Sequence, residues 1–140
     1  MLLKPILFGL ALSTASISAA WAQFTTADII GNYKIIKGID QDGATYDGTV
    51  QISPDASGGV TVRWDDGSIG LGMIEGSKLY VGMVYEKRSI IMSMDINPGG
   101  LITGKYIQRT YPGNGIEHWK KYGPAISLSP KSSVLRAGTR

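Results

Sequence analysis

Apolar and polar residues alternate along several short segments of the chain. In residues 60–65, for example, Val60, Val62 and Trp64 alternate with polar or charged side chains. A period of two is typical of a β-strand with one buried face. We therefore predict eight strands, over residues 32–39, 45–52, 60–65, 68–74, 78–85, 89–96, 101–110 and 115–121. Residues 25–30 are predicted to form one helical turn before the first strand.

Turn signals separate these segments at nearly regular spacing. Asp42-Gly43 and Asp66-Gly67 suit two-residue hairpins, in which both central positions take positive φ. Every connection is short enough to join neighbouring strands. Closing such a sheet on itself removes its two exposed edges. The sequence therefore predicts an all-β fold, a small antiparallel up-and-down β-barrel of about eight strands.

The segments at 78–85 and 89–96 are apolar on both faces. One face of the first segment consists of Leu79, Val81, Met83 and Tyr85. A barrel has one interior, so one face of each segment must remain outside, where a contiguous apolar patch marks a contact site. We therefore predict a homodimer that meets through Leu79, Val81, Met83 and Tyr85. The alternative is that residues 24–30, or the C-terminal tail, cover the exposed face.

The first residues carry the pattern of a secretory signal peptide. Lys4 supplies a positive charge, an apolar run follows, and Ala20-Trp21-Ala22 provides a small-x-small cleavage site. We predict a signal peptide over residues 1–22, an exported protein that is periplasmic or secreted, and no membrane span in the mature chain. A retained membrane anchor is the alternative. The remaining chain divides into one β-barrel domain, residues 23–119, and a basic tail, residues 120–140, predicted to be disordered.

Composition narrows the range of functions. The chain has no cysteine, so its fold relies on packing and strand pairing rather than on disulfides. Residues 23–119 contain eight lysines and arginines against eleven acidic residues, and a basic excess lies in the tail. Neither a basic face nor interleaved basic and aromatic residues point to nucleic acid, so we expect no nucleic-acid partner.

Candidate catalytic residues are few. His118 is the one histidine, and its neighbour Glu117 points to the opposite face if both lie on a strand. Asp40, Asp42 and Asp47 lie close together, but aspartates favour tight turns and this spacing is not that of a calcium-binding loop. We therefore predict a non-catalytic protein with no cofactor and no metal site. A weak enzyme that depends on His118 is the alternative.

The aromatic and methionine residues point to binding instead. An eight-stranded barrel either fills its interior with side chains or holds one small ligand there. If the interior is hollow, we expect the ligand site to include Trp64, Trp119, Met73 and Tyr33, with the tryptophans near the mouth. The predicted function is that of an exported binding module for a small apolar ligand or an extracellular protein. The alternative is a periplasmic inhibitor or accessory protein that acts through a protruding loop at residues 111–115.

A sparse motif of glycines and aromatic residues covers residues 31–119. It consists of Gly31-Asn32-Tyr33, Gly38, Gly43, Tyr46-x-Gly48, Trp64, Gly70-Leu71-Gly72-Met73, Leu101, Gly104 and Gly115-Ile116-Glu117. This pattern resembles a family of short secreted bacterial proteins commonly labelled "fibronectin-binding protein", a label that implies binding to extracellular matrix. Members often carry cysteines near the positions of Val60 and Gly72, which this chain lacks. The glycine–aromatic opening is also similar to avidin-like and lipocalin-like barrels, which bind small molecules in the barrel mouth.

Overall fold

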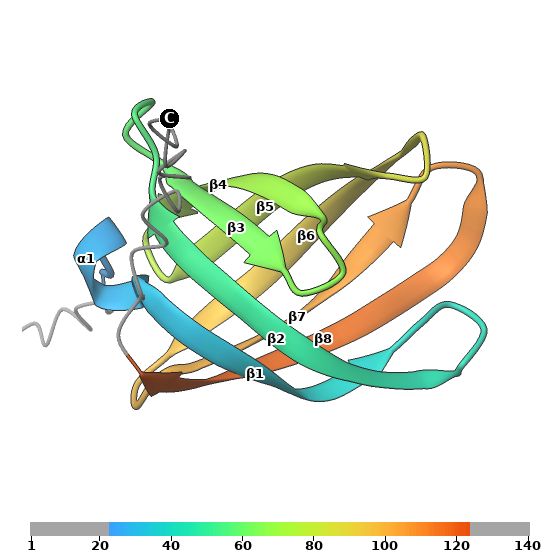
Figure 1. The fold of residues 1–140 in the computed structure, drawn as a ribbon, viewed down its shortest axis with the longest axis horizontal. Helices are drawn as coiled ribbons and strands as arrows, with labels where there is room; N and C mark the ends of the chain where they lie inside the picture. Colours follow the sequence, from blue (N-terminus) through green and yellow to red (C-terminus); the bar gives the residue numbers. More distant parts are fainter. Residues whose placement is uncertain (1–22, 124–140) are drawn as a thin grey trace, which may run out of the picture.

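Eight antiparallel strands close into an up-and-down barrel in the computed structural model, which describes residues 23–123 (Figure 1). The strands are β1 (Gly31–Ile39), β2 (Thr45–Pro54), β3 (Val60–Trp64), β4 (Ile69–Glu75), β5 (Lys78–Tyr85), β6 (Arg88–Asn97), β7 (Leu101–Gln108) and β8 (Tyr111–Gly123). Each strand pairs with the next along the chain, and β8 pairs with β1. The predicted fold class is therefore confirmed. Helix α1 (Thr26–Ile29) supplies the predicted helical turn, and no helix within the described range is long and apolar enough to cross a bilayer.

The last strand differs most from its prediction. β8 begins at Tyr111, which pairs with Gln108 across the hairpin, and ends at Gly123, which pairs with Asn32 of β1. The segment 111–115 is therefore the start of a strand rather than a protruding loop. The barrel likewise extends four residues beyond the predicted domain end, to Gly123. The predicted signal peptide and the rest of the predicted tail lie outside the described residues.

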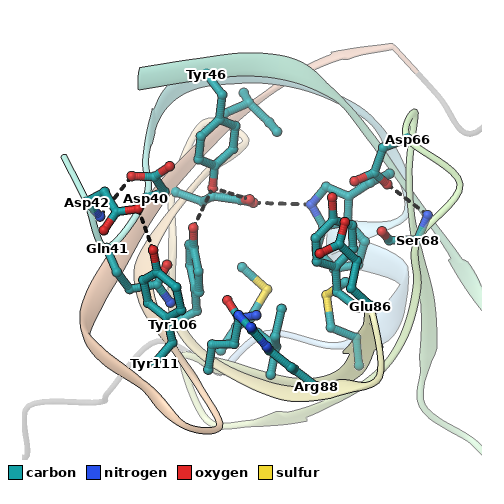
Figure 2. Close-up of a pocket in the computed structure, with 18 of the residues that line it drawn as sticks. Asp40, Gln41, Asp42, Tyr46, Asp66, Ser68, Glu86, Arg88, Tyr106 and Tyr111 are labelled. Carbon is teal, nitrogen blue, oxygen red and sulfur yellow. Dashed lines mark hydrogen bonds between the residues drawn. The ribbon is translucent and has the colours of Figure 1, made fainter. Parts of the chain in front are cut away.

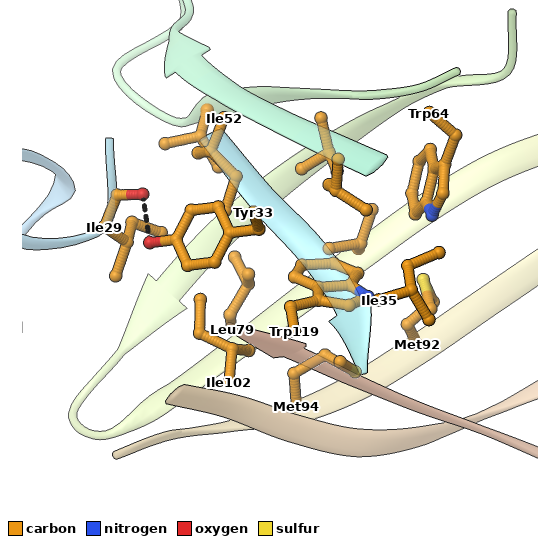
Figure 3. Close-up of a cluster of buried hydrophobic side chains, with 14 of the residues drawn as sticks. Ile29, Tyr33, Ile35, Ile52, Trp64, Leu79, Met92, Met94, Ile102 and Trp119 are labelled. Carbon is orange, nitrogen blue, oxygen red and sulfur yellow. Dashed lines mark hydrogen bonds between the residues drawn. The ribbon is translucent and has the colours of Figure 1, made fainter. Parts of the chain in front are cut away.

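One end of the barrel is closed by α1 and by aromatic side chains. Ile29 of α1 is buried, and the Tyr33 hydroxyl donates a hydrogen bond to its carbonyl over 2.6 Å (Figure 3). Deeper in the barrel, Trp119 meets the Tyr33 ring at 61° with 6.4 Å between centroids. The Phe24 N–H donates to the Gly76 carbonyl over 3.0 Å, which anchors the preceding segment. Residues 24–30 therefore close the barrel end rather than cover the outer face of β5 and β6.

Side-chain alternation decides which face of β5 is outside. Leu79 and Val81 are fully buried in the core, and Met83 packs against it, so the predicted interface face points inward. This corrects the prediction that Leu79, Val81 and Met83 form the dimer contact. Tyr85, the fourth predicted residue, is 39% exposed at the end of β5. Six apolar side chains on β4 to β7 are each more than half accessible: Ile69, Leu71, Met73, Val84, Ile91 and Ile107. We call these six residues the outer patch.

We expect Tyr33→Phe to lower the free energy of unfolding by about 1–2 kcal/mol, because it leaves the buried Ile29 carbonyl without its hydrogen bond. As a control, Tyr122→Phe removes a hydroxyl from a side chain that is 56% exposed. This change should alter the free energy of unfolding by less than about 0.5 kcal/mol. Urea unfolding curves measure both values. Equal effects of the two changes would contradict a stabilising role for the contact between Tyr33 and α1.

Candidate functional site

The barrel is open at the end opposite α1. The β1–β2, β3–β4, β5–β6 and β7–β8 hairpins surround this opening. A cavity of about 540 Å³ extends from it into the barrel (Figure 2). Ligand cavities in proteins commonly measure roughly 300–1,000 Å³. The interior is thus filled at the α1 end and hollow at the other.

A buried carboxylate lies on the wall of this cavity. Glu117 of β8 is 6% exposed. The Tyr46 hydroxyl donates to Glu117 Oε1 over 2.7 Å. The indole N–H groups of Trp64 and Trp119 donate to Oε2 over 3.2 and 2.6 Å. All three donors are neutral, so the network joins β2, β3 and β8 around a carboxylate without contributing a positive charge.

Burial raises the pKa of Glu117 above its ordinary value and outweighs the opposing effect of its three hydrogen bonds. The negative charge of Asp66 acts in the same direction as burial. Burial, with the charge of Glu117, also raises the pKa of Tyr46 above that of a free tyrosine. The charged forms of Glu117 and Tyr46 are therefore disfavoured on this wall. A positive charge beside Glu117 would favour its ionised form.

Glycines allow two tyrosine rings to reach this network. A β-carbon at Gly38 would come within 2.7 Å of the Tyr46 ring, and one at Gly115 would overlap the ring of Tyr106. A larger residue at either position would displace the ring that packs on it. The hydroxyl oxygens of Tyr46 and Tyr106 lie 3.3 Å apart, so Tyr106 extends the hydrogen-bonded network along the cavity wall.

The cavity has a polar wall and an apolar wall. The polar wall comes from β2, β3, β7 and β8 and consists of Tyr46, Trp64, Tyr106 and Glu117. The apolar wall comes from β5 and β6 and consists of Met83, Ile90 and Met92. Because the strands follow one another around the closed barrel, β5 and β6 lie across the interior from β1 and β2, so the apolar wall faces Tyr46 of β2 and Ile35 of β1. Tyr106 of β7 instead lies beside Met92 of β6, its register partner. A ligand in the cavity would therefore meet polar and apolar groups on different strands.

The mouth of the cavity is acidic. Its lining carboxylates, besides that of Glu117, belong to Asp40, Asp42, Asp47, Asp65, Asp66 and Glu86. Turn formation accounts for part of this, since Asp40 Oδ1 accepts hydrogen bonds from the backbone N–H groups of Asp42 and Ala44 over 2.9 Å each. Arg88 is the one basic residue among the described lining residues, and its guanidinium lies 5.5 Å from the centroid of the Tyr111 ring. The Tyr111 hydroxyl in turn donates to Asp42.

Gln41 brings an unpaired polar group to the same opening. Its side-chain nitrogen is buried and has no hydrogen-bond partner among residues 23–123, and the residue lines the cavity. A buried amide without a partner costs about 1–3 kcal/mol. An acceptor atom of a bound molecule would satisfy this nitrogen.

The structure brings together some of the residues predicted to bind a ligand and separates others. Trp64 lines the cavity, whereas Trp119 is fully buried and does not line it. The centroids of the two rings lie 5.9 Å apart, in a near-perpendicular arrangement. Tyr33 instead packs at the closed end, away from the cavity lining. Met73 points outward and is 60% exposed, because β4 turns its glycines toward the interior. Trp119, Tyr33 and Met73 are therefore corrected as ligand-site residues, although the Trp119 N–H donates to Glu117, which lines the cavity.

Sequence reasoning missed Glu117, Tyr46 and Tyr106 as site residues. The signal for Glu117 is its place two residues before Trp119, because a period of two puts both side chains on the same face of β8. His118 lies on the other face and does not line the cavity. Among the described residues, no cluster of three potential metal-ligating side chains occurs.

Glu117→Gln should make stability less dependent on pH. Because the pKa of Glu117 is raised in the folded protein, its stabilising contribution is full below the ordinary value of about 4.5 and falls as pH rises through the raised value. Glutamine stays neutral throughout, so we expect the variant to gain melting temperature over the wild type as pH rises to neutral. Glu75→Gln, which removes an exposed carboxylate, is the control. Parallel curves for wild type and Glu117→Gln would contradict the expectation.

Comparisons with known protein families and with curated proteins do not assign this chain to a family. No protein family matches the chain, and no curated protein matches it. The function is therefore inferred from the cavity and its lining residues.

Proposed function

We propose that this protein is an exported, non-catalytic binding module that holds a small, largely apolar molecule in the open end of its barrel. The observation that carries the proposal is the cavity of about 540 Å³, which remains hollow although the other end of the same barrel is filled. Its apolar wall offers Met83 and Met92, whose flexible side chains adapt to irregular ligands. Export rests on the signal-peptide pattern of residues 1–22.

Other features of the cavity support binding of a molecule rather than solvent alone. Trp64 and Tyr106 offer aromatic surface, and Gln41 offers a buried donor without a partner. Small-molecule sites combine apolar and aromatic surface with polar groups that fix the orientation of the ligand, and this cavity offers both. The Tyr46 hydroxyl donates to Glu117, but burial raises the pKa of this tyrosine, which makes it a weak nucleophile and favours binding over catalysis.

The neutral apolar dye N-phenylnaphthylamine tests the proposal. We expect its fluorescence to rise on binding at one site per barrel, with a dissociation constant of about tens of micromolar or tighter for a ligand of this size. Ile90→Trp fills the cavity and should weaken binding by about tenfold or more. Ile91→Trp places the same side chain on the outer face of the same strand and should leave binding unchanged. Equal effects of the two variants, or no binding by the wild type, would refute the proposal.

We also propose that the outer patch is the contact surface of a homodimer. Its members form neighbouring positions across the sheet, where Leu71 pairs with Gly82, Gly82 with Ile91, and Ile91 with Ile107. A β-carbon at Gly82 would meet nothing within 4 Å, so the surface there is open to an approaching side chain. A second copy brings an apolar surface of the same extent, and symmetric dimers bury such patches most often.

Light scattering across micromolar concentrations tests the dimer. The wild type should show twice the mass of one chain, and Ile91→Lys should show the mass of one chain, because a lysine would be buried without a partner. Ile36→Lys changes an equally exposed isoleucine on β1 and should leave the dimer intact. A wild-type mass of a single chain throughout this range would contradict the proposal.

A further inference from the structure

The charges around the cavity do not balance. Seven carboxylates line it, including that of Glu117, against the single guanidinium of Arg88. The one ion pair within residues 23–123 joins Lys78 and Asp95, and neither residue lines the cavity. Arg88 contacts the Tyr111 ring rather than a carboxylate at ion-pair distance. The negative potential of the mouth is therefore not compensated by the protein's own lining residues.

Turn chemistry explains only part of this charge. Asp65 accepts a hydrogen bond from the Thr49 N–H of β2. Asp40 and Asp66 accept hydrogen bonds from backbone N–H groups of their own turns, as aspartates in tight turns do. Such bonds hold the turns but leave the negative charge in place. Glu117 belongs to no turn. It lies within β8 among buried aromatic residues, at a position where an apolar side chain would continue the core.

The surroundings of Glu117 suit a positive charge. A carboxylate has about four sites that accept hydrogen bonds, and its three donors leave one for a ligand. The residue itself lines the cavity. The rings of Tyr46, Trp64 and Tyr106 lie on the same wall, and aromatic rings attract cations through their π-faces. A cation here would meet a carboxylate and aromatic surface together.

We propose that the ligand of this cavity is a small organic amine, with its ammonium group against Glu117 and its apolar body against Met83, Ile90 and Met92. This inference rests on the proposed function and adds the chemical class of the ligand. The cavity fits such a molecule, because Glu117 of β8 and the apolar side chains of β5 and β6 line the same cavity from strands that are not adjacent. The acidic mouth attracts cations toward the opening and repels anions.

Three ligands of matched length test the charge preference at neutral pH: octylamine, octanol and octanoate. Binding is followed by the fluorescence of Trp64 and Trp119. We expect octylamine to bind about tenfold more tightly than octanol, since a hydrogen bond to a charged group contributes more than a neutral one, and octanoate to bind least tightly. This comparison uses the unaltered protein, so its outcome does not depend on how a variant folds.

Glu117→Gln tests the role of the carboxylate itself. The variant should lose about tenfold in affinity for octylamine and keep its affinity for octanol. Glu75→Gln removes the same charge from the outer face of the barrel and should change neither affinity. Equal binding of octylamine, octanol and octanoate would overturn the amine inference and leave the binding function standing. Failure of all three ligands and of the apolar dye would overturn both.

Discussion

Pairing of β1 with β8 is the constraint on which the rest of the structure depends. This ladder closes the sheet, so every strand has one inward and one outward face. The ladder is irregular, with register shifts on both sides of β1 around residues 35–38. Ile36 and Lys37 consequently both point outward, and the alternation resumes with Gly38 inside. Because Gly38 then lies under the Tyr46 ring, a bulge in the closing strand positions the tyrosine that donates to Glu117.

The number and order of the strands were predictable because alternation and turn residues are local signals. Which face points inward was predictable only where the two faces differ in polarity. β4 shows the limit, since Leu71 and Met73 face outward while Gly70 and Gly72 face the core. The reason lies in the two adjacent strands: a β-carbon at Gly72 would come within 2.8 Å of Val60 on β3 and 3.0 Å of Leu79 on β5. Interior crowding of this kind overrides the apolar pattern, and its trace in the segment's own sequence is the pair of glycines, Gly70 and Gly72.

The candidate site was predictable in part for a related reason. Trp64 belongs to a strand with clear alternation, so its place inside the barrel follows from the pattern. Glu117 breaks the pattern, because carboxylates are almost never fully buried unless paired. Its partners come from β2, β3 and its own strand, up to 71 positions apart in sequence. Only the closed barrel brings Tyr46 and Trp64 to Glu117, so no local signal identifies these two partners.

The two ends of the barrel solve different physical problems within one interior. At the α1 end, Tyr33 satisfies its buried hydroxyl with a backbone carbonyl of the chain itself, and the surrounding side chains are apolar. At the open end, Glu117 places a carboxylate inside the barrel, and its three neutral donors form hydrogen bonds to it without supplying a positive charge. An apolar residue at this position would avoid the free-energy cost of desolvating a carboxylate. A protein that violates packing rules at one position commonly does so where it functions. The buried carboxylate of Glu117 lies on the wall of the hollow part of the interior, where a ligand can supply the missing positive charge.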